Sequence, residues 1–517
     1  MSKSPAIGID LGTTYSAIAW VDPTGRPQTL ANAEGDKVTP SVVLFENDEV
    51  VIGKEALKAI TTDAEQVAQC MKRELGSRSF AKQLGGRHYP PEALEAWILH
   101  KIRTDAAQAI GNFTKAVITV PAYFDEVRRK ATQDAGFIAG LEVIDIINEP
   151  TAAAIAFGYE QGFLREHHTR TRPLRILVYD LGGGTFDVTV MEISGTDFTA
   201  LATDGDVRLG GLDWDGRLVD LVAEEFIRQF DLDPREDANT MGRLWRDSED
   251  AKRTLSARQK ATIPCDYQGK ALRLEVSRQQ FEEATQDLLD RTSFTTRQTL
   301  QAAGLGWNDI DRILLVGGST RMPAVAGLLK QMSQIEPDTS VAADEAVAHG
   351  AALHAERLLA ESRGEPAKFS VKNVNSHSLG VAASDPLTRQ SRNAIIIPRN
   401  TPLPITAKRI FKTQNDGQKS VLVQIVEGES ASADECVQLG RCTVRNLPAD
   451  LPAQSPIDVR FCYLENGRLT VTVLVGPAEN WEQHEITRVN SLTSEQLRTW
   501  REFVTGISAN RPLDSTS

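Results

Sequence analysis

The pattern of apolar and polar residues changes near residue 362. Before that point, short apolar runs alternate with stretches in which apolar residues recur every three to four positions, which predicts strands alternating with helices. After it, the helical period disappears and apolar residues alternate with polar ones, as at 457–463, where every odd-numbered position is apolar. The first part therefore predicts an α/β fold, and the second predicts antiparallel β-sheet with one face buried.

The expected elements follow from these two periods. In the first part we expect strands at 116–120, 143–147, 175–179 and 313–316, and helices at 91–110, 126–139, 151–159, 216–230, 277–303 and 344–359. In the second part we expect strands at 405–411, 420–426, 442–445, 457–463 and 468–475, with a tight turn at Asn466-Gly467. One short helix at 492–504 follows, capped by Thr493 or Ser494, and then a frayed tail.

A chain of 517 residues is too long for one hydrophobic core, so two or three domains are expected. We divide it into an α/β domain at 1–362, a linker at 363–375, a β-sandwich domain at 376–485, and a short helix with its tail at 486–517. The two patterns of periodicity set the first of these boundaries, because the change of texture falls beside the Ser-Arg-Gly-Glu-Pro stretch at 362–366.

One motif occurs twice, as IGIDLGTT at 7–14 and as LVYDLGGGT at 177–185. Each copy is an apolar run that ends in an aspartate and is followed by a glycine turn with threonine, which predicts a hairpin with little side-chain bulk at its tip. Backbone N–H groups can approach an anion there, and the hydroxyls add donors. Since an aspartate repels phosphate unless a cation lies between them, the pair predicts a metal–nucleotide complex held between two related halves.

Two further residues could act on such a phosphate. Lys72 could neutralise charge on a transferring phosphoryl group, although a solvated lysine at a helix end is the simpler interpretation. Glu149 follows a predicted strand and precedes Pro150, which favours a sharp change from strand to helix. Its carboxylate would face the ligand crevice, or it would simply be favoured by the helix dipole.

Two segments could contact a nucleoside. Glu249, Lys252, Arg253 and Ser256 share one helix face, so they form either a salt-bridged surface or a polar clamp in which Glu249 and Lys252 meet the ribose. The GGSTR segment at 317–321 follows an apolar strand and precedes a helix that begins at Pro323, an arrangement that can approach a phosphate or only cap a helix.

Composition narrows the function classes. The net charge of −13 argues against nucleic acid as the main partner. The five cysteines form no CxxC pair and the eight histidines show no ligand spacing, so neither a disulfide framework nor a zinc site is expected. We find no secretory leader and no apolar span of membrane length, so we expect a cytoplasmic protein without a membrane partner. No Ser/His/Asp or Cys/His arrangement suggests a nucleophile, and no covalent intermediate is expected.

Eight motifs in order resemble the heat shock protein 70 family of DnaK-type chaperones from Ala6 to about Thr505. They are GIDLGTTYS at 8–16, VPAYFDEVRRKATQDAG at 120–136, INEPTAAAIAFG at 147–158, YDLGGGTFDVTV at 179–190, LGGLDWD at 209–215, EDAKRTLS at 249–256, LVGGSTRMP at 315–323 and ADEAVAHGAA at 343–352. The resemblance implies an actin-like ATPase, two-lobed with a duplicated ribonuclease-H-like core, followed by an all-β sandwich that binds peptide and by a short helix.

The resemblance also implies roles for individual residues. ATP or ADP would be bound by Asp10, Gly12, Thr13, Thr14, Tyr15, Gly182, Gly183, Gly184, Thr185, Glu249, Lys252, Arg253, Ser256, Gly317, Gly318, Ser319, Arg321 and Asp344. In-line attack of water on the γ-phosphate would depend on Lys72, Glu149, Asp180, Thr185 and Asp187. Asp10 and Asp180 would hold Mg²⁺ through waters, Tyr15 and Asp187 would lie near K⁺ sites, and Pro121 and Arg129 would relay the nucleotide state.

The β part resembles the family through HSLGV at 377–381, RNTPLP at 399–404, RIFKT at 409–413 and QIVEGE at 424–429. The family binds extended polypeptide there by main-chain hydrogen bonds and an apolar pocket. Phe411, Val421 and Val423 would line that pocket, or they would be ordinary sandwich core. The loop at 389–393 is polar where the family has an apolar arch, which leaves the client preference open. The implied partners are unfolded polypeptides, a J-domain cochaperone and a nucleotide-exchange factor.

Two departures from the family pattern are expected to matter. The family's linker has leucines and an aspartate where this chain has FSVKNV at 369–374. Losing two buried leucines could remove several kcal/mol of docking free energy, more than a typical allosteric coupling of ~1–3 kcal/mol. We therefore expect weaker communication between ATP and peptide. After the β domain the sequence has room for one helix in place of the family's helical lid, so we expect fast peptide release.

Two other functions stay open at this point. A nucleotide-switched scaffold for one specialised protein partner would fit the altered linker. A small-molecule kinase of the actin-like superfold would fit the cleft, but it would have no use for the peptide-binding motifs.

Overall fold

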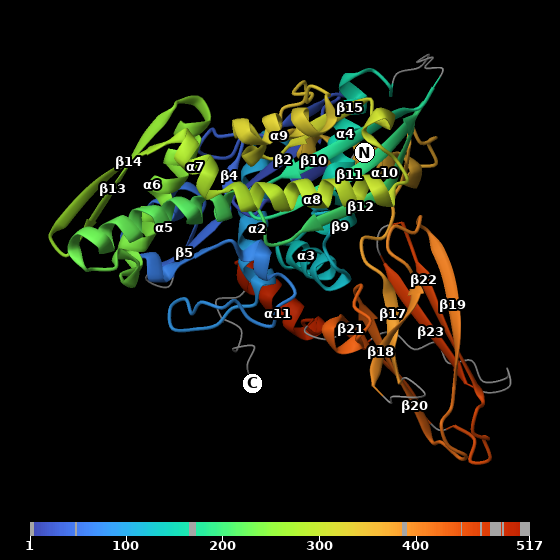
Figure 1. Ribbon diagram of the computed structural model, residues 1–517. Coiled ribbons are helices and arrows are strands. Elements are labelled where there is room, and N and C mark those ends of the chain that lie inside the picture. The colour runs from blue at the N-terminus through green and yellow to red at the C-terminus, as the bar shows by residue number, and fades with distance from the viewer. Residues whose placement is uncertain are drawn as a thin grey trace.

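The computed structural model describes residues 5–46, 49–164, 172–384, 390–445, 447–465, 468–475, 487–488 and 491–506. Figure 1 shows an α/β part, and a β-rich part that extends from one side of it in orange. The C-terminal helix α11 (Ser494–Val504), in red, lies against the α/β part. The expected turn at Asn466-Gly467 and the expected tail lie outside the described residues.

The α/β part contains two central sheets with the same local strand order. In each sheet an antiparallel hairpin, β1–β2 or β10–β11, is followed on its other side by a parallel strand, β8 or β15. The first sheet has β1 (Ile7–Asp10), β2 (Tyr15–Val21), β3 (Pro27–Thr29), β4 (Thr39–Pro40), β8 (Lys115–Val120) and β9 (Glu142–Asn148). The second has β10 (Leu174–Leu181), β11 (Phe186–Ser194), β12 (Asp197–Asp206), β15 (Arg312–Val316) and β16 (Ser370–Lys372). The predicted α/β fold with two related halves is confirmed.

Two helices join the two halves. Helix α10 (Ala346–Ser362) lies on the first sheet, α4 (Glu149–Glu160) contacts the second, and the two helices pack on each other. Their approach is close, since a Cβ added to Gly350 would lie 2.8 Å from the Cα of Ala152, a separation that real Cβ atoms do not show. Small residues at this crossing therefore hold the two halves at short range.

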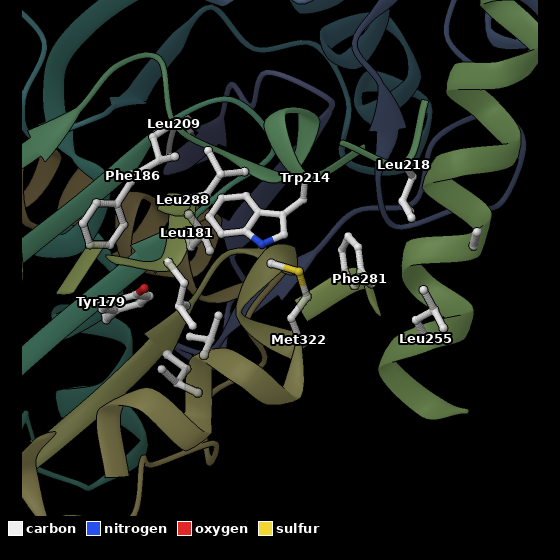
Figure 2. Packing of buried hydrophobic residues seen from close by; sticks show 14 of the residues in the cluster. Tyr179, Leu181, Phe186, Leu209, Trp214, Leu218, Leu255, Phe281, Leu288 and Met322 are labelled. Atoms are coloured by element: carbon white, nitrogen blue, oxygen red, sulfur yellow. The ribbon is translucent and has the colours of Figure 1, made fainter. Parts of the chain in front are cut away.

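The core of the second half lies behind the second glycine turn. Figure 2 shows Phe186, the first residue after that turn, near Tyr179 and Leu209, with Trp214 close to Met322. The rings of Tyr179 and Phe186 are 4.7 Å apart, and all of these side chains are buried. This packing fixes the strands that carry the turn.

The remaining helices cover the sheets and build two smaller outer units. One unit is the sheet β5 (Val42–Glu46), β6 (Glu49–Ile52) and β7 (Val67–Gln69), and the other contains the hairpin β13 (Lys260–Tyr267) and β14 (Lys270–Ser277), which the sequence patterns did not predict. The other helices are α1 (Lys54–Ala59), α2 (Pro91–Ile110), α3 (Glu126–Ile138), α5 (Gly211–Phe230), α6 (Ala238–Ala257), α7 (Arg278–Ala284), α8 (Gln286–Ala302) and α9 (Pro323–Ser333).

Two helix predictions differ from the structure. The single helix expected at 277–303 is two helices, α7 and α8, which meet at Thr285. The Thr285 hydroxyl donates to the Phe281 carbonyl at 2.8 Å, and such a bond competes with regular helix geometry. Helix α5 begins five residues earlier than expected, because the Asp213 carboxylate accepts from the Gly210 N–H at 2.8 Å and supports an earlier first turn.

The β part is a sandwich with one buried cluster between two sheets. The expected strands are present, and two more, β17 and β18, precede them. One sheet has β17 (Leu379–Ser384), β18 (Ser391–Ile397), β20 (Ser420–Glu427), β21 (Val437–Arg445) and β24 (Thr487–Arg488), and the other has β19 (Ile405–Lys412), β22 (Pro456–Tyr463) and β23 (Leu469–Val475).

The segment predicted as a linker is docked on the α/β part. Its strand β16 pairs in parallel with β12, and Phe369, Val371 and Val374 are all buried. The ring of Phe369 lies 5.9 Å from that of Phe198. Although the leucines of the family's linker are replaced here, Phe369, Val371 and Val374 still anchor the segment. The weaker coupling between ATP and peptide that we expect from this segment stays a prediction.

The β sandwich and helix α11 both contact the α/β part directly. Trp500 of α11 lies 5.9 Å from the ring of Tyr89 and 6.3 Å from that of Trp97, so the helix is held by aromatic packing. At the sandwich, ion pairs and hydrogen bonds join His377 to Tyr123, Arg399 to Asp204, Asn400 to Thr203, and Glu427 to Glu126.

Candidate active site

The tips of the two glycine hairpins meet face to face. A Cβ added to Gly183 would lie 2.6 Å from Cγ2 of Thr14, and one added to Gly184 would lie 2.8 Å from Cβ of Thr13. Only glycine fits at these two positions without moving the threonines of the opposite turn. The turns form the floor of a cavity of about 550 Å³, a size typical of small-molecule sites.

The cavity gathers nearly all of the residues proposed for the nucleotide. Gly184 and Asp187 are outside its lining, since Gly184 lies against Thr13 and Asp187 is buried on β11 opposite Asp180. The proposed residues that line it are Asp10, Gly12, Thr13, Thr14, Tyr15, Lys72, Glu149, Asp180, Gly182, Gly183, Thr185, Glu249, Lys252, Arg253, Ser256, Gly317, Gly318, Ser319, Arg321 and Asp344.

A buried ion pair lies beside the phosphate-sized turns. Lys72 donates to Glu149 Oε1 at 2.6 Å, and the two residues are 2% and 7% exposed. Lys72 is on the 3₁₀ turn η2 (Met71–Glu74), which starts after Cys70 in a left-handed conformation with φ of 61°. Glu149 opens α4 directly after β9. A solvated lysine is therefore excluded, and Glu149 combines both of its interpretations, as a carboxylate in the first turn of a helix that also faces the cleft.

Carboxylates outnumber cations around this pair. Burial and the charge of Glu149 raise the pKa of Asp10 to about 7, and burial also raises the pKa of Asp187 to about 8 and that of Asp180 well above its usual range. Burial opposes the charge on Lys72, but Glu149 and Asp10 outweigh it and raise the pKa of this lysine. Because a buried excess of carboxyl groups is costly without a counter-charge, these residues suit a bound cation.

The donor set fits Mg²⁺ held through waters. Among the described residues no three His, Cys, Asp or Glu side chains lie close enough together to ligate one ion directly. Mg²⁺ usually keeps several waters and takes only one or two carboxylates together with phosphate oxygens. Asp10, whose Oδ1 accepts from the Thr119 hydroxyl at 3.3 Å, and Asp180 are the two carboxylates at the ends of the matching strands.

The wall opposite the turns is made by α6 and by the turn after β15. Lys252 donates to Asp215 at 2.7 Å and to the Gly211 carbonyl at 2.9 Å, so its ammonium group points into the protein and not into solvent. Arg253 pairs with Glu249 at 2.5 Å and also donates to the Tyr15 hydroxyl at 3.1 Å. The salt-bridged interpretation therefore holds for Glu249 and Arg253, while the clamp on a ribose stays a prediction.

The turn after β15 is tied to the second glycine turn. The Ser319 hydroxyl donates to the Gly182 carbonyl at 2.9 Å, and Arg321 pairs with Asp344 at 2.5 Å across the cavity rim. Gly317 has a φ of 82°, and a Cβ there would lie 2.6 Å from the carbonyl carbon of Leu181, so this position requires glycine.

A cross-cleft contact was missed by the sequence patterns. Arg73 pairs with Asp213 at 2.6 Å and also donates to the Gly184 carbonyl at 2.9 Å, which connects the first half of the α/β part to the second. Asp213 stands in the LGGLDWD motif and Arg73 follows Lys72, but no spacing in the sequence links the two. Asp215, the partner of Lys252, is a second such residue.

The proposed peptide-contacting residues lie in the sandwich core. Val421 and Val423 are 5% and 6% exposed and belong to the buried cluster between the two sheets, and Phe411 is half-buried against that cluster. Their position therefore matches the core interpretation. A role in binding peptide stays a proposal.

One proposed relay position, Pro121, lies in the connection between β8 and α3, and the other, Arg129, lies in the first turn of α3. Pro121 directly follows β8, and Arg129 donates to the carbonyls of Ala122 and Phe124 at 2.9 and 3.0 Å. Arg129 also lines a small cleft with Asn375, Leu403 and Tyr463 of the segment that leads into the sandwich and of the sandwich itself.

Two sheets of one strand order, facing glycine turns and a buried lysine–carboxylate pair define a two-lobed ATPase of the actin-like kind. A family model described as Hsp70 protein matches residues 6–502, and the chain belongs to this family. It is 39% identical over 505 residues to a chaperone protein DnaK of Thermotoga petrophila, covering 96% of this chain and 82% of the relative. It is 37% identical to chaperone proteins DnaK of Metamycoplasma hominis and of Halobacterium salinarum, covering 99% and 97% of this chain and 84% and 78% of the relatives.

Members of the Hsp70 family are nucleotide-binding ATPases that act as chaperones, and the protein belongs to that class. Across the part of the chain that the structure describes, none of the helices combines the length and the apolar composition needed to cross a bilayer.

Proposed function

We propose that the cleft between the two lobes binds ATP with Mg²⁺ and directs water at the γ-phosphate. The observation that carries this proposal is the Lys72–Glu149 pair, buried beside two facing glycine turns in a cavity of about 550 Å³. Backbone N–H groups of the turns, with the hydroxyls of Thr13, Thr14 and Thr185, would hold the β- and γ-phosphates.

The ion pair gives each partner a distinct task. The Glu149 carboxylate would accept a hydrogen bond from the attacking water and orient it in line with the bond to the leaving oxygen. The Lys72 ammonium, whose raised pKa keeps it charged, would stabilise negative charge that develops on the equatorial oxygens. Mg²⁺ bound between Asp10 and Asp180 would neutralise charge on the β- and γ-phosphates.

We also propose a K⁺ site near Asp187, which is buried beside the cleft. Asp187 is 1% exposed and accepts from the Tyr123 N–H at 2.9 Å, which leaves further oxygen lone pairs for a monovalent ion. The support is weaker at Tyr15, because its hydroxyl already accepts from the cationic Arg253.

We propose that the β sandwich binds extended segments of unfolded polypeptides, and that a J-domain cochaperone and a nucleotide-exchange factor act on the protein in the cytoplasm. The support in the sandwich is two large apolar side chains, Ile410 and Leu422, that are 60% and 62% exposed on β19 and β20. Strand β19 is also an edge of its sheet, which suits strand addition by an extended chain.

A second candidate is a nucleotide-switched scaffold for one protein partner. The observation that favours it is the linker, in which Lys372 and Asn373 stand between the buried Val371 and Val374. The kinase interpretation gains no such support, because the family match continues through the β sandwich to residue 502.

The test is ATPase turnover with and without an unfolded polypeptide, for the parent and for Lys72→Ala. We expect Lys72→Ala to lower kcat by about 10²–10³-fold, and Lys330→Ala, on the exposed side of α9, to leave it unchanged. Binding of many unrelated peptides would support the chaperone function, and binding of a single partner would support the scaffold. Unchanged turnover in Lys72→Ala would contradict the assignment of the site.

A further inference from the structure

A second cavity lies away from the ATP cleft, where helix α11 meets helix α2. Its volume is about 560 Å³, and its lining comes from α2, from the connection after it, from the turn after α3, and from α11 with the residue that follows it. These segments are far apart in the sequence, at 100–140 and at 501–505, so the cavity exists only while α11 is docked. The lining residues are His100, Arg103, Thr104, Ala107, Gln108, Asn112, Thr114, Gly140, Arg501 and Thr505.

Two guanidinium groups meet in this cavity without a counter-charge. Arg103 donates to the Ala139 carbonyl at 3.1 Å, and Arg501 lies over the Phe137 ring at 4.9 Å. Neither arginine forms an ion pair with any of the residues that the structure describes. Burial lowers the pKa of Arg103, and the positive charge of Arg501 lowers it further.

The arginines are also held in place by the packing around them. Gly140 has a φ of 81°, and a Cβ there would lie 3.6 Å from Cζ of Arg103 and 3.4 Å from Cγ2 of Thr505, so the guanidinium lies directly on the glycine backbone. The Trp500 side chain, next to Arg501, is 4% exposed in the aromatic cluster under α11. Two like charges are therefore kept together by contacts that do not compensate them.

A third lining residue has an unsatisfied nitrogen. Nδ1 of His100 is buried and has no hydrogen-bond partner among the described residues. Burial lowers the pKa of this imidazole, a hydrogen bond to the Ala139 backbone partly opposes that shift, and the charge of Arg103 adds to it. Since buried polar atoms are nearly always paired, an orphaned nitrogen beside two unpaired guanidinium groups indicates a missing polar partner.

We propose that this cavity binds a phosphate group, either as free phosphate or as a phosphate monoester. A guanidinium group offers a fork of donors that matches phosphate oxygens, and two such groups balance the charge of a dianion. The amides and hydroxyls of Gln108, Asn112 and Thr114 would surround the rest of the ligand.

Occupancy of the site has a structural consequence. Arg103 belongs to α2 and Arg501 to α11, so one bound phosphate bridges the ATPase part and the C-terminal helix. The bridge removes the repulsion between the two arginines and stabilises the docked helix. The ligand and the docked helix therefore stabilise each other.

The test is calorimetric titration of the full chain with inorganic phosphate and with glycerol phosphate, after the ATP cleft has been saturated with ADP and Mg²⁺. We expect saturable binding of at least one of them, with an affinity about tenfold or more lower in both Arg103→Gln and Arg501→Gln. The matched control is Arg498→Gln, an exposed arginine on the same helix, which should bind as the parent does. Binding of the ester alone, or of phosphate alone, identifies the source of the phosphate group.

Thermal unfolding supplies a second measurement that does not depend on affinity. Without phosphate, Arg103→Gln should melt at or above the temperature of the parent, because the repulsion between guanidinium groups is relieved. With phosphate, the parent should gain stability and the variant should gain none. Equal phosphate binding by parent and both arginine variants, binding of citrate but of neither phosphate compound, or no binding by the folded parent would each overturn the proposal.

Discussion

The ATP cleft and the junction between the α/β part and the β sandwich both bury carboxyl groups, but they do so in different ways. In the cleft, Asp10 and Asp180 face an open cavity with Lys72 as the nearest cation. At the junction, Glu427 is 3% exposed and accepts from the Glu126 N–H at 3.0 Å, and burial raises its pKa well above the usual range. The cleft leaves room for a cation beside its acids, whereas at the junction the protein itself supplies a hydrogen-bond donor, the Glu126 N–H, to the buried carboxyl group of Glu427.

The difference shows how buried acid can serve binding or assembly. A buried carboxylate is costly unless it is paired, and it then gains its partner either from a ligand or from the protein itself. The acids of the cleft would gain their partner from a ligand. The acid of the junction already accepts a hydrogen bond from the protein, so docking of the sandwich needs no added ion there.

The largest effect that separates the two regions is expected from replacing one carboxyl group by an amide in each. Glu149→Gln should lower kcat for ATP by about 10²–10³-fold, because the attacking water loses its acceptor. Glu427→Gln should leave basal turnover unchanged, since Glu427 does not line the cleft and the amide oxygen can still accept from the Glu126 N–H. Steady-state phosphate release measures both. Equal losses in the two variants would show that the regions are not distinct.

A smaller effect is expected from the linker that lies between the two regions. Phe369→Ala removes a buried ring that packs on Phe198 and should cost about 3 kcal/mol of docking free energy. Stimulation of ATP hydrolysis by an unfolded polypeptide should disappear while basal turnover stays. Exposed Lys368→Ala provides the control. Stimulation in the parent that equals that of the DnaK relatives would contradict the weaker coupling expected from this linker.

The dependence of stability on pH should respond to a bound nucleotide for the acids of the cleft and not for the acid of the junction. Because the pKa of Asp10 is raised to about 7 and that of Asp187 to about 8, the folded state holds these protons more tightly than the unfolded chain. Their contribution is therefore complete below about pH 4 and is lost as the pH rises toward 8. Calorimetry should show a Tm that falls from pH 5 to pH 8 in the free protein.

Adding the ligand and comparing variants then shows which acidic residues cause the decrease of Tm with pH. The part of the decrease in Tm that disappears in Asp187→Asn should become smaller when Mg²⁺ and ADP are bound, because the cation favours the ionised acids. The part that disappears in Glu427→Gln should be the same with and without Mg²⁺ and ADP. Glu95, buried in the core with no hydrogen-bond partner among the described residues and a pKa raised to about 8, adds to the slope in the same direction. A Tm that rises across this range in every variant would contradict the assignment.

The smallest effect is expected from the contact that closes the cleft. Arg73→Ala removes the ion pair with Asp213 and the hydrogen bond to the Gly184 carbonyl. Charge-assisted hydrogen bonds of this kind contribute about 1.5–3 kcal/mol, so nucleotide release should be about tenfold faster. Stopped-flow release of a fluorescent ADP measures this rate. The exposed Arg78→Ala is the control, and unchanged release in Arg73→Ala would show that the contact does not hold the cleft closed.

Local pattern was sufficient for much of the fold and for the core of the site. The repeated Asp-Leu-Gly turns at 10–12 and 180–182 predicted two facing hairpins, because glycine, threonine and aspartate determine how closely a backbone can approach an anion. The alternation at 457–463 predicted strand β22 for an equally local reason. Glu149 could be placed because a proline after a strand leaves few conformations open.

Tertiary structure decided whatever depends on residues far apart in the sequence. Only packing shows that Lys72 is buried against Glu149, that Arg73 reaches Asp213, that Val421 and Val423 lie in the sandwich core, and that Arg103 meets Arg501. Sequence periodicity reports the local environment of a residue along its own element. It carries no record of which other element comes to lie across from it, because that is set by the packing of whole faces against one another.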